Sequence, residues 1–278
     1  MFGLLVVRGH WRALSPIFHG GNEKTGATLT LNKIRFVMED GDYEDIPFVS
    51  GNAIRGYLRR LVMKDFLDLT GYEIDVSRKS GQRLYHALFT GGVLETVEGL
   101  SGGAIDVDLK RRIVQLLFPV RLFGFSIGNQ MVESKLKVHH AYPVCRELKP
   151  FLPDNLDPKC SFYDLITTLY QTRRDELRAE REEGEQAVQM LVEYEAFAPG
   201  TVFYHEFRLE DPEPIDVSCL ARAIELWKKK PYIGGKSSIG FGEIQLNYEI
   251  SETSERYVKA VEENKEEIVK LLEELEGR

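Results

Sequence analysis

The sequence of 278 residues contains few cysteines and no long hydrophobic run. Its three cysteines, Cys145, Cys160 and Cys219, are so widely spaced that they form neither a paired-thiol zinc motif nor an even-numbered disulfide framework. No apolar stretch approaches the length that spans a bilayer. These absences speak against a secreted disulfide scaffold, a zinc finger and a membrane-spanning protein. We therefore expect a reducing, cytoplasmic location without membrane contact.

The start of the chain lacks the features of a secretory signal. Its apolar run, Met1–Val7, is followed at once by Arg8, His10 and Arg12, without a small-residue cleavage site. We interpret this run as a first β-strand. Because 43% of the residues are hydrophobic and 29% are charged, the chain is able to bury a sizeable core, which excludes disorder.

An excess of basic residues is also missing. The 36 Lys and Arg residues are outnumbered by 44 Asp and Glu residues, and the net charge is −8. For the whole chain, this charge argues against nucleic-acid binding, which requires a surface that neutralises phosphates. The charge is uneven, however: residues 1–150 carry +4, residues 151–250 carry −8 and residues 251–278 carry −4. A basic face on the first part is therefore compatible with an acidic protein.

The pattern of apolar residues predicts a mixed α+β fold. Alternating and β-rich runs predict strands at residues 2–8, 27–37, 135–142, 193–197, 202–209 and 243–250. Helical spacing predicts helices at residues 52–69, 216–229 and 254–276. Residues 146–192 contain prolines and then a highly charged stretch, which is typical of an exposed insertion. We expect one domain of split β-α-β type over residues 1–278, with a C-terminal helix in residues 252–278.

The most specific motif is a turn that leads into a helix with several arginines. In Pro47-Phe-Val-Ser-Gly-Asn-Ala-Ile-Arg-Gly56, the proline fixes an extended backbone and Ser50-Gly51-Asn52 turns the chain. The free N–H groups at a helix start attract anions, and Arg55 and Arg59 lie one turn apart, off the apolar stripe. An ordinary N-capped helix with solvated arginines has the same pattern. The motif alone does not decide between the two interpretations.

A glycine-rich stretch precedes the last predicted strand. It is not a P-loop, because Lys230 occupies a position where that motif requires glycine, and it is not a dinucleotide fingerprint, because Gln245 occupies another. Lys236, Ser237 and Ser238 nevertheless supply one positive charge and two hydroxyl groups, which suit a backbone phosphate of a polymer. A tight loop without a ligand is the alternative.

The titratable residues show no catalytic or metal-binding pattern. No two histidines have the i, i+4 spacing of a helical metal site, and the carboxylates fall in charged helical runs without an Asp-x-Asp motif. We therefore expect no cofactor and no metal. The six histidines, which we interpret as structural or polar contacts, are His10, His19, His86, His139, His140 and His205.

Taken together and in this order, the motifs resemble the RAMP superfamily of CRISPR-associated proteins. Within that family the chain is similar to the backbone subunit that lines up along guide RNA in multi-subunit effector complexes. The resemblance rests on Pro47–Gly56, Leu122-Phe-Gly124 with Ser134–Ala141, Val192–Phe203, and Gly234–Gly242.

The resemblance implies a ferredoxin-like, RRM-type core whose copies stack head to tail beside other effector subunits. Residues 146–190 match the insertion called the thumb, which folds over the guide RNA (crRNA). The subunit would hold the sugar-phosphate so that the bases pair with target nucleic acid, in defence against viruses and plasmids. The residues expected to contact RNA are His19, Asn32, Lys33, Arg35, Ser50, Asn52, Arg55, Arg59, Lys135, Lys137, His139, Arg173, Arg174, Arg178, Lys236, Ser237 and Ser238.

Two departures from the family pattern affect the expected activity. Relatives that cut target RNA have an aspartate before the first helix, whereas the counterpart here, Leu29–Val37, contains no Asp, and Asn32 is its closest polar residue. We therefore expect no cleavage by this subunit. The Asp-Ala pair of the central strand is His140-Ala141, and the form of the turn favours a type IV-like or type I-like branch.

Two other functions stay open at this point. A RAMP-type endoribonuclease would process repeat RNA with a histidine such as His19 or His139 as general acid–base on a ribose 2′-hydroxyl. A plain α+β scaffold would bind no nucleic acid and would have no basic groove.

Overall fold

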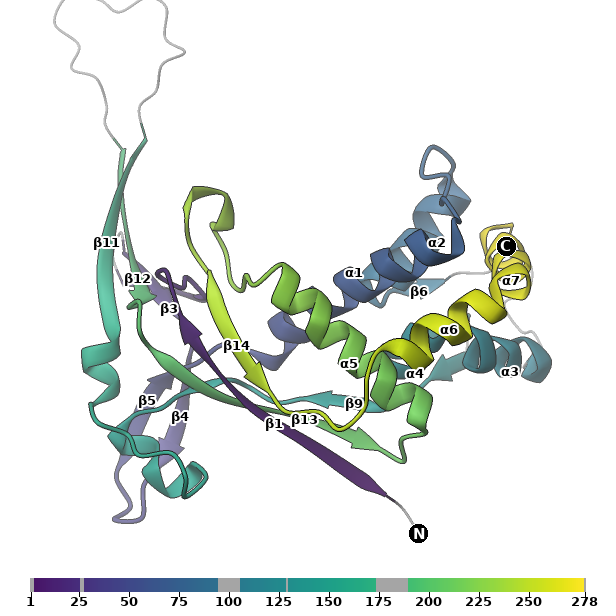
Figure 1. Cartoon of the computed structure of the whole chain (residues 1–278). Coiled ribbons are helices and arrows are strands. Elements are labelled where there is room, and N and C mark those ends of the chain that lie inside the picture. Colours follow the sequence, from purple (N-terminus) through teal and green to yellow (C-terminus); the bar gives the residue numbers. More distant parts are fainter. Residues whose placement is uncertain (1–2, 26–27, 95–105, 129, 174–189, 278) are drawn as a thin grey trace, which may run out of the picture.

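A five-stranded antiparallel sheet forms the centre of the computed structural model, which describes residues 3–25, 28–94, 106–128, 130–173 and 190–277 (Figure 1). The strand order is β10 (Tyr142–Pro143), β13 (Val202–Glu210), β1 (Leu4–Ala13) and β14 (Ile244–Tyr248), and β9 (Leu136–Val138) also pairs with β13. Helix α1 (Gly51–Thr70) lies between β1 and β9 in the chain, and α5 (Pro214–Lys229) lies between β13 and β14. The chain thus follows a split β-α-β path twice, and the predicted α+β class is confirmed.

Alternation along the central strands decides which face of the sheet carries the core. In β1, Val7, Trp11 and Ala13 are buried, whereas Arg8 and Arg12 are exposed. Apolar residues at helical spacing in α1, including Ile54, Leu58, Val62 and Phe66, are buried in the same cluster. The sheet and the helices therefore share one core, as their apolar periodicities predict.

A layer of further helices extends from α1 and α5 (Figure 1). It contains α2 (Lys79–Thr90), α3 (Val107–Leu116), α4 (Phe118–Phe123), α6 (Glu255–Glu263) and α7 (Lys265–Glu276), with the short strands β6 (Val93–Leu94), β7 (Phe125–Ile127) and β8 (Gln130–Val132). The prediction of one C-terminal helix is wrong, because the chain breaks at Asn264 into α6 and α7. No helix in the described part of the chain is long and apolar enough to cross a membrane.

A long β-hairpin stands at the edge of the molecule (Figure 1). Its strands, β11 (Ile166–Arg173) and β12 (Met190–Phe197), pair along their whole length, and β3 (Thr28–Leu31) and β2 (Gly20–Thr25) extend the sheet beyond β12. Strand β11 lies within the predicted insertion, whereas most of β12 lies beyond it and includes the predicted strand at residues 193–197. The most charged part of the insertion, residues 174–189, is outside the described residues.

The first part of the predicted insertion is packed and is not an exposed excursion. Its 3₁₀ turns, η1 (Arg146–Phe151) and η2 (Phe162–Leu165), join the two-stranded sheet of β4 (Lys33–Val37) and β5 (Tyr43–Pro47). Ile46, Cys145, Leu148, Leu152 and Phe162 form a second buried cluster there. Of the prolines that suggested a loop, Pro150 lies inside η1, and Pro153 and Pro158 lie between the two turns. The predicted strand 27–37 is divided into β3 and β4.

Candidate nucleic-acid interface

The start of α1 is fixed by its own turn residues. The Ser50 side chain accepts a hydrogen bond from the Ala53 N–H at 3.2 Å and caps the helix. Gly51 is required at the next position, because a Cβ there would lie 2.3 Å from the Val138 carbonyl oxygen. The predicted turn is thus correct, and the Ser50 hydroxyl oxygen already has a partner within the protein.

Two histidine rings accept hydrogen bonds from the first amides of this turn. The Ser50 N–H donates to His19 Nε2 at 3.2 Å, and the Gly51 N–H donates to His140 Nδ1 at 2.9 Å. Burial lowers the pKa of both rings, and the neighbouring His140 lowers the pKa of His19 further. Both imidazoles are therefore uncharged acceptors at neutral pH.

A cleft of about 380 Å³ opens beside this turn. Helix α1, the end of α2 and the glycine-rich loop surround it. The residues that line it are His19, Asn52, Ala53, Gly56, Tyr57, Arg60, Phe89, Thr90, Ile233 and Gly234.

The glycine-rich loop is attached to the strand segment that ends at His19. The Gly235 N–H donates to the Phe18 carbonyl at 2.8 Å, and Gly234 has a φ of +82° with the Phe18 oxygen 2.5 Å from the position of a Cβ. Lys236 turns away from the cleft toward the hairpin: its Nζ lies 4.6 Å from the centre of the Tyr194 ring and 3.2 Å from Gln171 Oε1. The next two residues, Ser237 and Ser238, are exposed.

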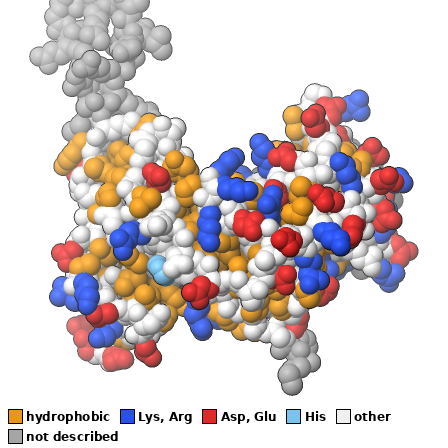
Figure 2. Space-filling model, in the orientation of Figure 1, with side chains coloured by type: hydrophobic (Ala, Val, Ile, Leu, Met, Phe, Trp, Pro, Cys, Tyr) orange, Lys and Arg blue, Asp and Glu red, His pale blue; other side chains and the backbone are white. Residues whose placement is uncertain are grey.

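Exposed cations continue from the cleft, which Arg60 lines, along α1 and to the end of α5. We call them the basic rim: Arg60 and Lys64 of α1, and Lys228, Lys229 and Lys230 at the end of α5. The Tyr57 hydroxyl donates to the Lys230 carbonyl at 2.8 Å and joins the two helices. Figure 2 shows Lys and Arg side chains gathered over this part of α1 and α5. Among the described residues, no carboxylate forms a salt bridge with any member of the rim.

Sequence reasoning missed the basic rim. The available signal was the run of three lysines that directly precedes the glycine-rich loop, together with Arg60 one helical turn after Gly56. The rim becomes visible only when α1 and the end of α5 are side by side, as Figure 1 shows.

The prediction that Arg59 lies off the buried stripe is wrong. Its side chain is 3% exposed, and its guanidinium donates to the carbonyls of Ala87, Leu88 and Gly124 at 3.0, 2.6 and 2.9 Å. Burial lowers its pKa to about 10, and the neighbouring Arg55 adds to this effect. Arg55 is half-buried and donates to the Phe123 carbonyl. Both arginines thus hold α1 to the adjoining helical segments.

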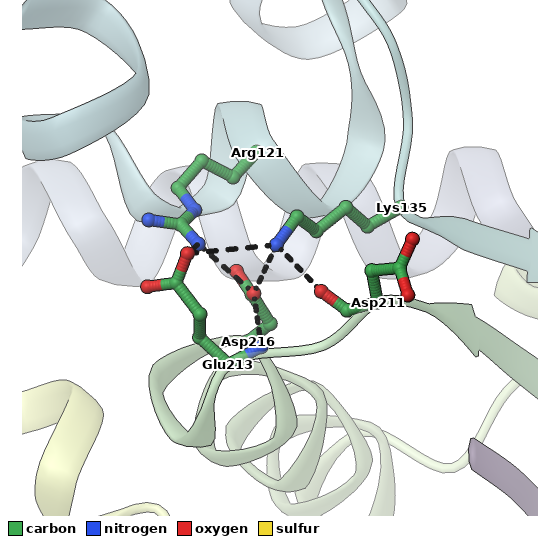
Figure 3. A network of polar contacts seen from close by, with 5 residues as sticks. All are labelled: Arg121, Lys135, Asp211, Glu213 and Asp216. Atoms are coloured by element: carbon green, nitrogen blue, oxygen red, sulfur yellow. Dashed lines mark hydrogen bonds and ion pairs between the residues drawn. The ribbon is translucent and has the colours of Figure 1, made fainter. Parts of the chain in front are cut away.

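Lys135, Lys137 and His139 are not brought to the cleft. Lys135 Nζ lies 2.9 Å from both the Asp216 carboxylate and the Asp211 carbonyl, and Arg121 binds the same Asp216 at 3.0 Å (Figure 3). This network is at the start of α5, about 24 Å from the other end of a helix of 16 residues.

The neighbours of Lys135 along the chain also face acids. Lys137 pairs with Glu210 at 3.2 Å, and His139 Nδ1 lies 3.6 Å from Glu206. These residues thus have intramolecular acidic partners, and none of them lines the cleft.

The remaining candidates are divided between the cleft and the hairpins. The Asn32 N–H donates to the His19 carbonyl at 3.0 Å, which places Asn32 beside the turn. Lys33 lies 3.5 Å from Glu195, and Arg35 forms two hydrogen bonds with Asp45 at 2.9 and 2.8 Å. Arg173 ends β11, whereas Arg174 and Arg178 are outside the described residues.

Comparisons with known proteins agree with this architecture. A chain of a solved structure described as a Type IV-B CRISPR complex is similar with a TM-score of 0.64 and 18% identity, over 89% of this chain and 91% of that chain. No curated protein sequence matches. The family model of the RAMP superfamily matches residues 12–245. Since this match covers most of the sequence, the chain belongs to the RAMP superfamily.

Proposed function

We propose that this chain is a subunit of a type IV-like CRISPR effector ribonucleoprotein that holds guide RNA by its sugar-phosphate. The observation that carries the proposal is the cleft beside α1, which combines the basic rim with hydroxyl and amide side chains. Membership of the RAMP superfamily and the fold shared with a chain of a Type IV-B CRISPR complex support it. The partners are then guide RNA, other effector subunits and further copies of the chain, head to tail.

The chemistry of the cleft suits a nucleic-acid backbone better than a base. Rim cations neutralise phosphates, and Asn52 in the cleft offers an exposed polar group to phosphate or ribose oxygens, as do the exposed Ser237 and Ser238 in the adjoining glycine-rich loop. Such contacts carry no sequence information, and base edges remain free to pair with a target strand. Defence against viruses and plasmids follows from this role as part of the same proposal.

We also propose that the chain has no nuclease activity. In support, Leu29–Val37 contains no aspartate, and His19 Nε2 and His140 Nδ1 already accept backbone amides. A histidine general base needs a free unprotonated nitrogen, which neither contact leaves available. The contact of His19 therefore speaks against the endoribonuclease alternative in which His19 is the general base. Discrete products from repeat-containing RNA that disappear in His19→Ala would reverse this proposal.

The test of RNA binding uses a labelled single-stranded RNA and two double variants of equal charge. The rim variant is Lys228→Glu with Lys229→Glu, and the control is Lys259→Glu with Lys270→Glu in α6 and α7. Fluorescence anisotropy should show at least about tenfold weaker binding for the rim variant and a change below about twofold for the control. The slope of log K against log salt should fall by about 1.4 for the rim variant, since single strands lose about 0.7 per phosphate contact.

Two results would contradict the proposed function. Equal losses in the rim variant and the control would indicate a general charge effect without a specific site. Failure of the wild-type chain to retain RNA of any length at low salt would reject RNA binding altogether.

A further inference from the structure

The two histidines at the start of α1 use opposite ring nitrogens. His19 accepts the Ser50 amide at Nε2, and His140 accepts the Gly51 amide at Nδ1. A backbone N–H can only donate, so each accepting nitrogen carries no proton, and an uncharged imidazole then holds its one proton on the other nitrogen. Two consecutive amides of one turn thus dictate opposite tautomers.

We infer that His19 is the Nδ1–H tautomer and His140 the Nε2–H tautomer, and that His19 Nδ1–H donates a hydrogen bond to a backbone oxygen of RNA in the cleft. The second half of this inference rests on the proposed function. It assigns His19 a fixed donor role, which differs from the acid–base role that an endoribonuclease requires.

Only one of the two rings reaches the cleft. His19 lines it together with Asn52 and Arg60, and in the described part of the chain its ring has no further hydrogen bond. His140 does not line the cleft: its ring packs 4.7 Å from Phe48 and 6.0 Å from Tyr142, measured between ring centres. The donor available to a ligand is therefore that of His19.

The surroundings keep His19 uncharged in the absence of a ligand. The lining contains no carboxylate, and its one cationic side chain is Arg60. Burial lowers the pKa of His19, and the nearby His140 lowers it further. The positive end of α1 beside the ring also disfavours an imidazolium ion. A neutral donor is thus present before RNA binds, at no cost in proton uptake.

The first experiment measures the tautomers without RNA. Long-range ¹H–¹⁵N spectra of the whole chain with ¹⁵N-labelled histidine, recorded at pH 7, should show a protonated Nδ1 for His19 and a protonated Nε2 for His140. The variants His19→Gln and His140→Asn assign the signals, because each variant removes one ring. The amide oxygen of the new side chain takes the place of the accepting nitrogen and keeps the hydrogen bond of the turn. Identical tautomers, or a charged ring, would overturn the inference.

The second experiment adds single-stranded RNA or DNA of the same sequence. Binding should shift the His19 Nδ1–H signal and leave His140 nearly unchanged; a shift with both polymers identifies a phosphate oxygen, and a shift with RNA alone identifies the 2′-hydroxyl. His19→Leu should bind RNA about fivefold more weakly, as expected for one lost hydrogen bond, whereas His19→Gln should stay within about twofold.

The outcomes separate this inference from the proposed function. Normal RNA affinity with an unmoved His19 signal rejects the donor role and leaves RNA binding intact. Absence of RNA binding by the wild-type chain rejects the proposed function and the donor role together, while the spectra without RNA still decide the tautomers. Thermal unfolding of each variant shows whether a loss of affinity reflects a loss of fold.

Discussion

Arg59 and Arg60 are adjacent in α1 and have opposite environments. Successive residues of an α-helix point about 100° apart, so one side chain enters the helical layer while the next reaches the cleft. Arg59 satisfies carbonyls of α2 and of the segment after α4, and Arg60 is exposed. The same residue type thus stabilises the interior at one position and is free for a ligand at the next.

Substitution of each arginine by leucine should separate these two roles. We expect Arg59→Leu to lower the free energy of unfolding by about 3 kcal/mol, because the carbonyls of Ala87, Leu88 and Gly124 lose their donors. Arg60→Leu should change it by less than about 0.5 kcal/mol and weaken RNA binding several-fold. Urea unfolding and anisotropy on the same samples check this; equal stability of the two variants would refute it.

His205 makes the stability of the protein depend on pH. The ring is buried, with the Tyr248 hydroxyl 2.8 Å from Nδ1 and the His139 carbonyl 3.1 Å from Nε2, and burial lowers its pKa to about 3. As the pH falls, the His205 ring of the unfolded chain, with an ordinary histidine pKa of 6.5, becomes protonated, whereas the buried ring of the folded chain stays uncharged. The contribution of His205 to the free energy of unfolding is therefore complete above pH 6.5 and is lost as the pH falls from there toward the pKa of the folded state.

Lowering the pH from 7.5 to 5.5 should thus reduce the free energy of unfolding by about 1.4 kcal/mol through His205 alone. His19 and His140 act in the same direction, because their pKa values are also lowered. Urea unfolding at the two pH values measures this loss, and the loss should be smaller in the variant His205→Gln. Wild-type stability that is constant over this range would contradict the prediction.

At the scale of elements, sequence patterns were reliable where a whole face is apolar. The buried stripes of α1 and α5, and the alternating Phe203, Phe207 and Leu209 of β13, can be read from the sequence, and these elements lie where they were expected. Helices α2 and α3 were missed because each is short and covers the core with few residues.

The C-terminal helix shows the limit of periodicity. Val261, Ile268 and Leu275 are all buried and seven residues apart, which predicts one helix. The break at Asn264 leaves this pattern intact and redirects α7 toward α2 and α3. Tertiary packing decides the direction of the chain there.

The candidate site was predicted only in part, for a similar reason. The turn at Ser50 and the glycine-rich loop are local motifs and were recognised. The burial of Arg59 and the position of the basic rim depend on which helices pack against each other. The periodicity of a single sequence does not show which helices are neighbours.

Lys236 connects the glycine-rich loop to the hairpin. Its backbone has a φ of +63°, which glycine adopts more easily than lysine. Lys236→Gly should thus relax the backbone, yet we expect it to speed hydrogen exchange at the base of β11 and β12 about fivefold, because the contacts with Tyr194 and Gln171 are lost. Ser238→Gly is the control in the same loop and should have no effect. Unchanged exchange in Lys236→Gly would show that the side chain does not hold the hairpin.

Across the whole molecule, segment charge was a poor guide to the basic face. Several cations of residues 1–150 are neutralised within the chain, as in the pairs Arg35–Asp45 and Lys137–Glu210. The basic rim instead takes Lys228, Lys229 and Lys230 from the segment with a net charge of −8. What matters for a polyanion is which cations lack an acidic partner, and that depends on tertiary contacts.

The head-to-tail arrangement belongs to the whole molecule and is tested there. If copies line up along a guide, the number of bound chains should rise in proportion to RNA length, so that doubling the RNA doubles the bound mass. Mass photometry at low salt measures this, with Arg60→Leu as a variant that lowers occupancy at equal protein concentration. A single chain bound at every length would contradict the arrangement, although RNA binding itself would stand.

Contacts between the first strand and the last third of the chain also determine when the protein becomes stable during its synthesis. The Gly3 N–H is bound by the Asp211 carboxylate, β1 pairs with β13 and β14, and Glu276 accepts from the Tyr72 hydroxyl and the Asp75 amide. A nascent chain thus exposes β1 without strand partners until β13 has been synthesised, because the paired residues range from Arg12 with Val202 to Leu4 with Glu210. Chaperones that shield β-strands during translation should therefore raise the yield of native protein more than those that act after release.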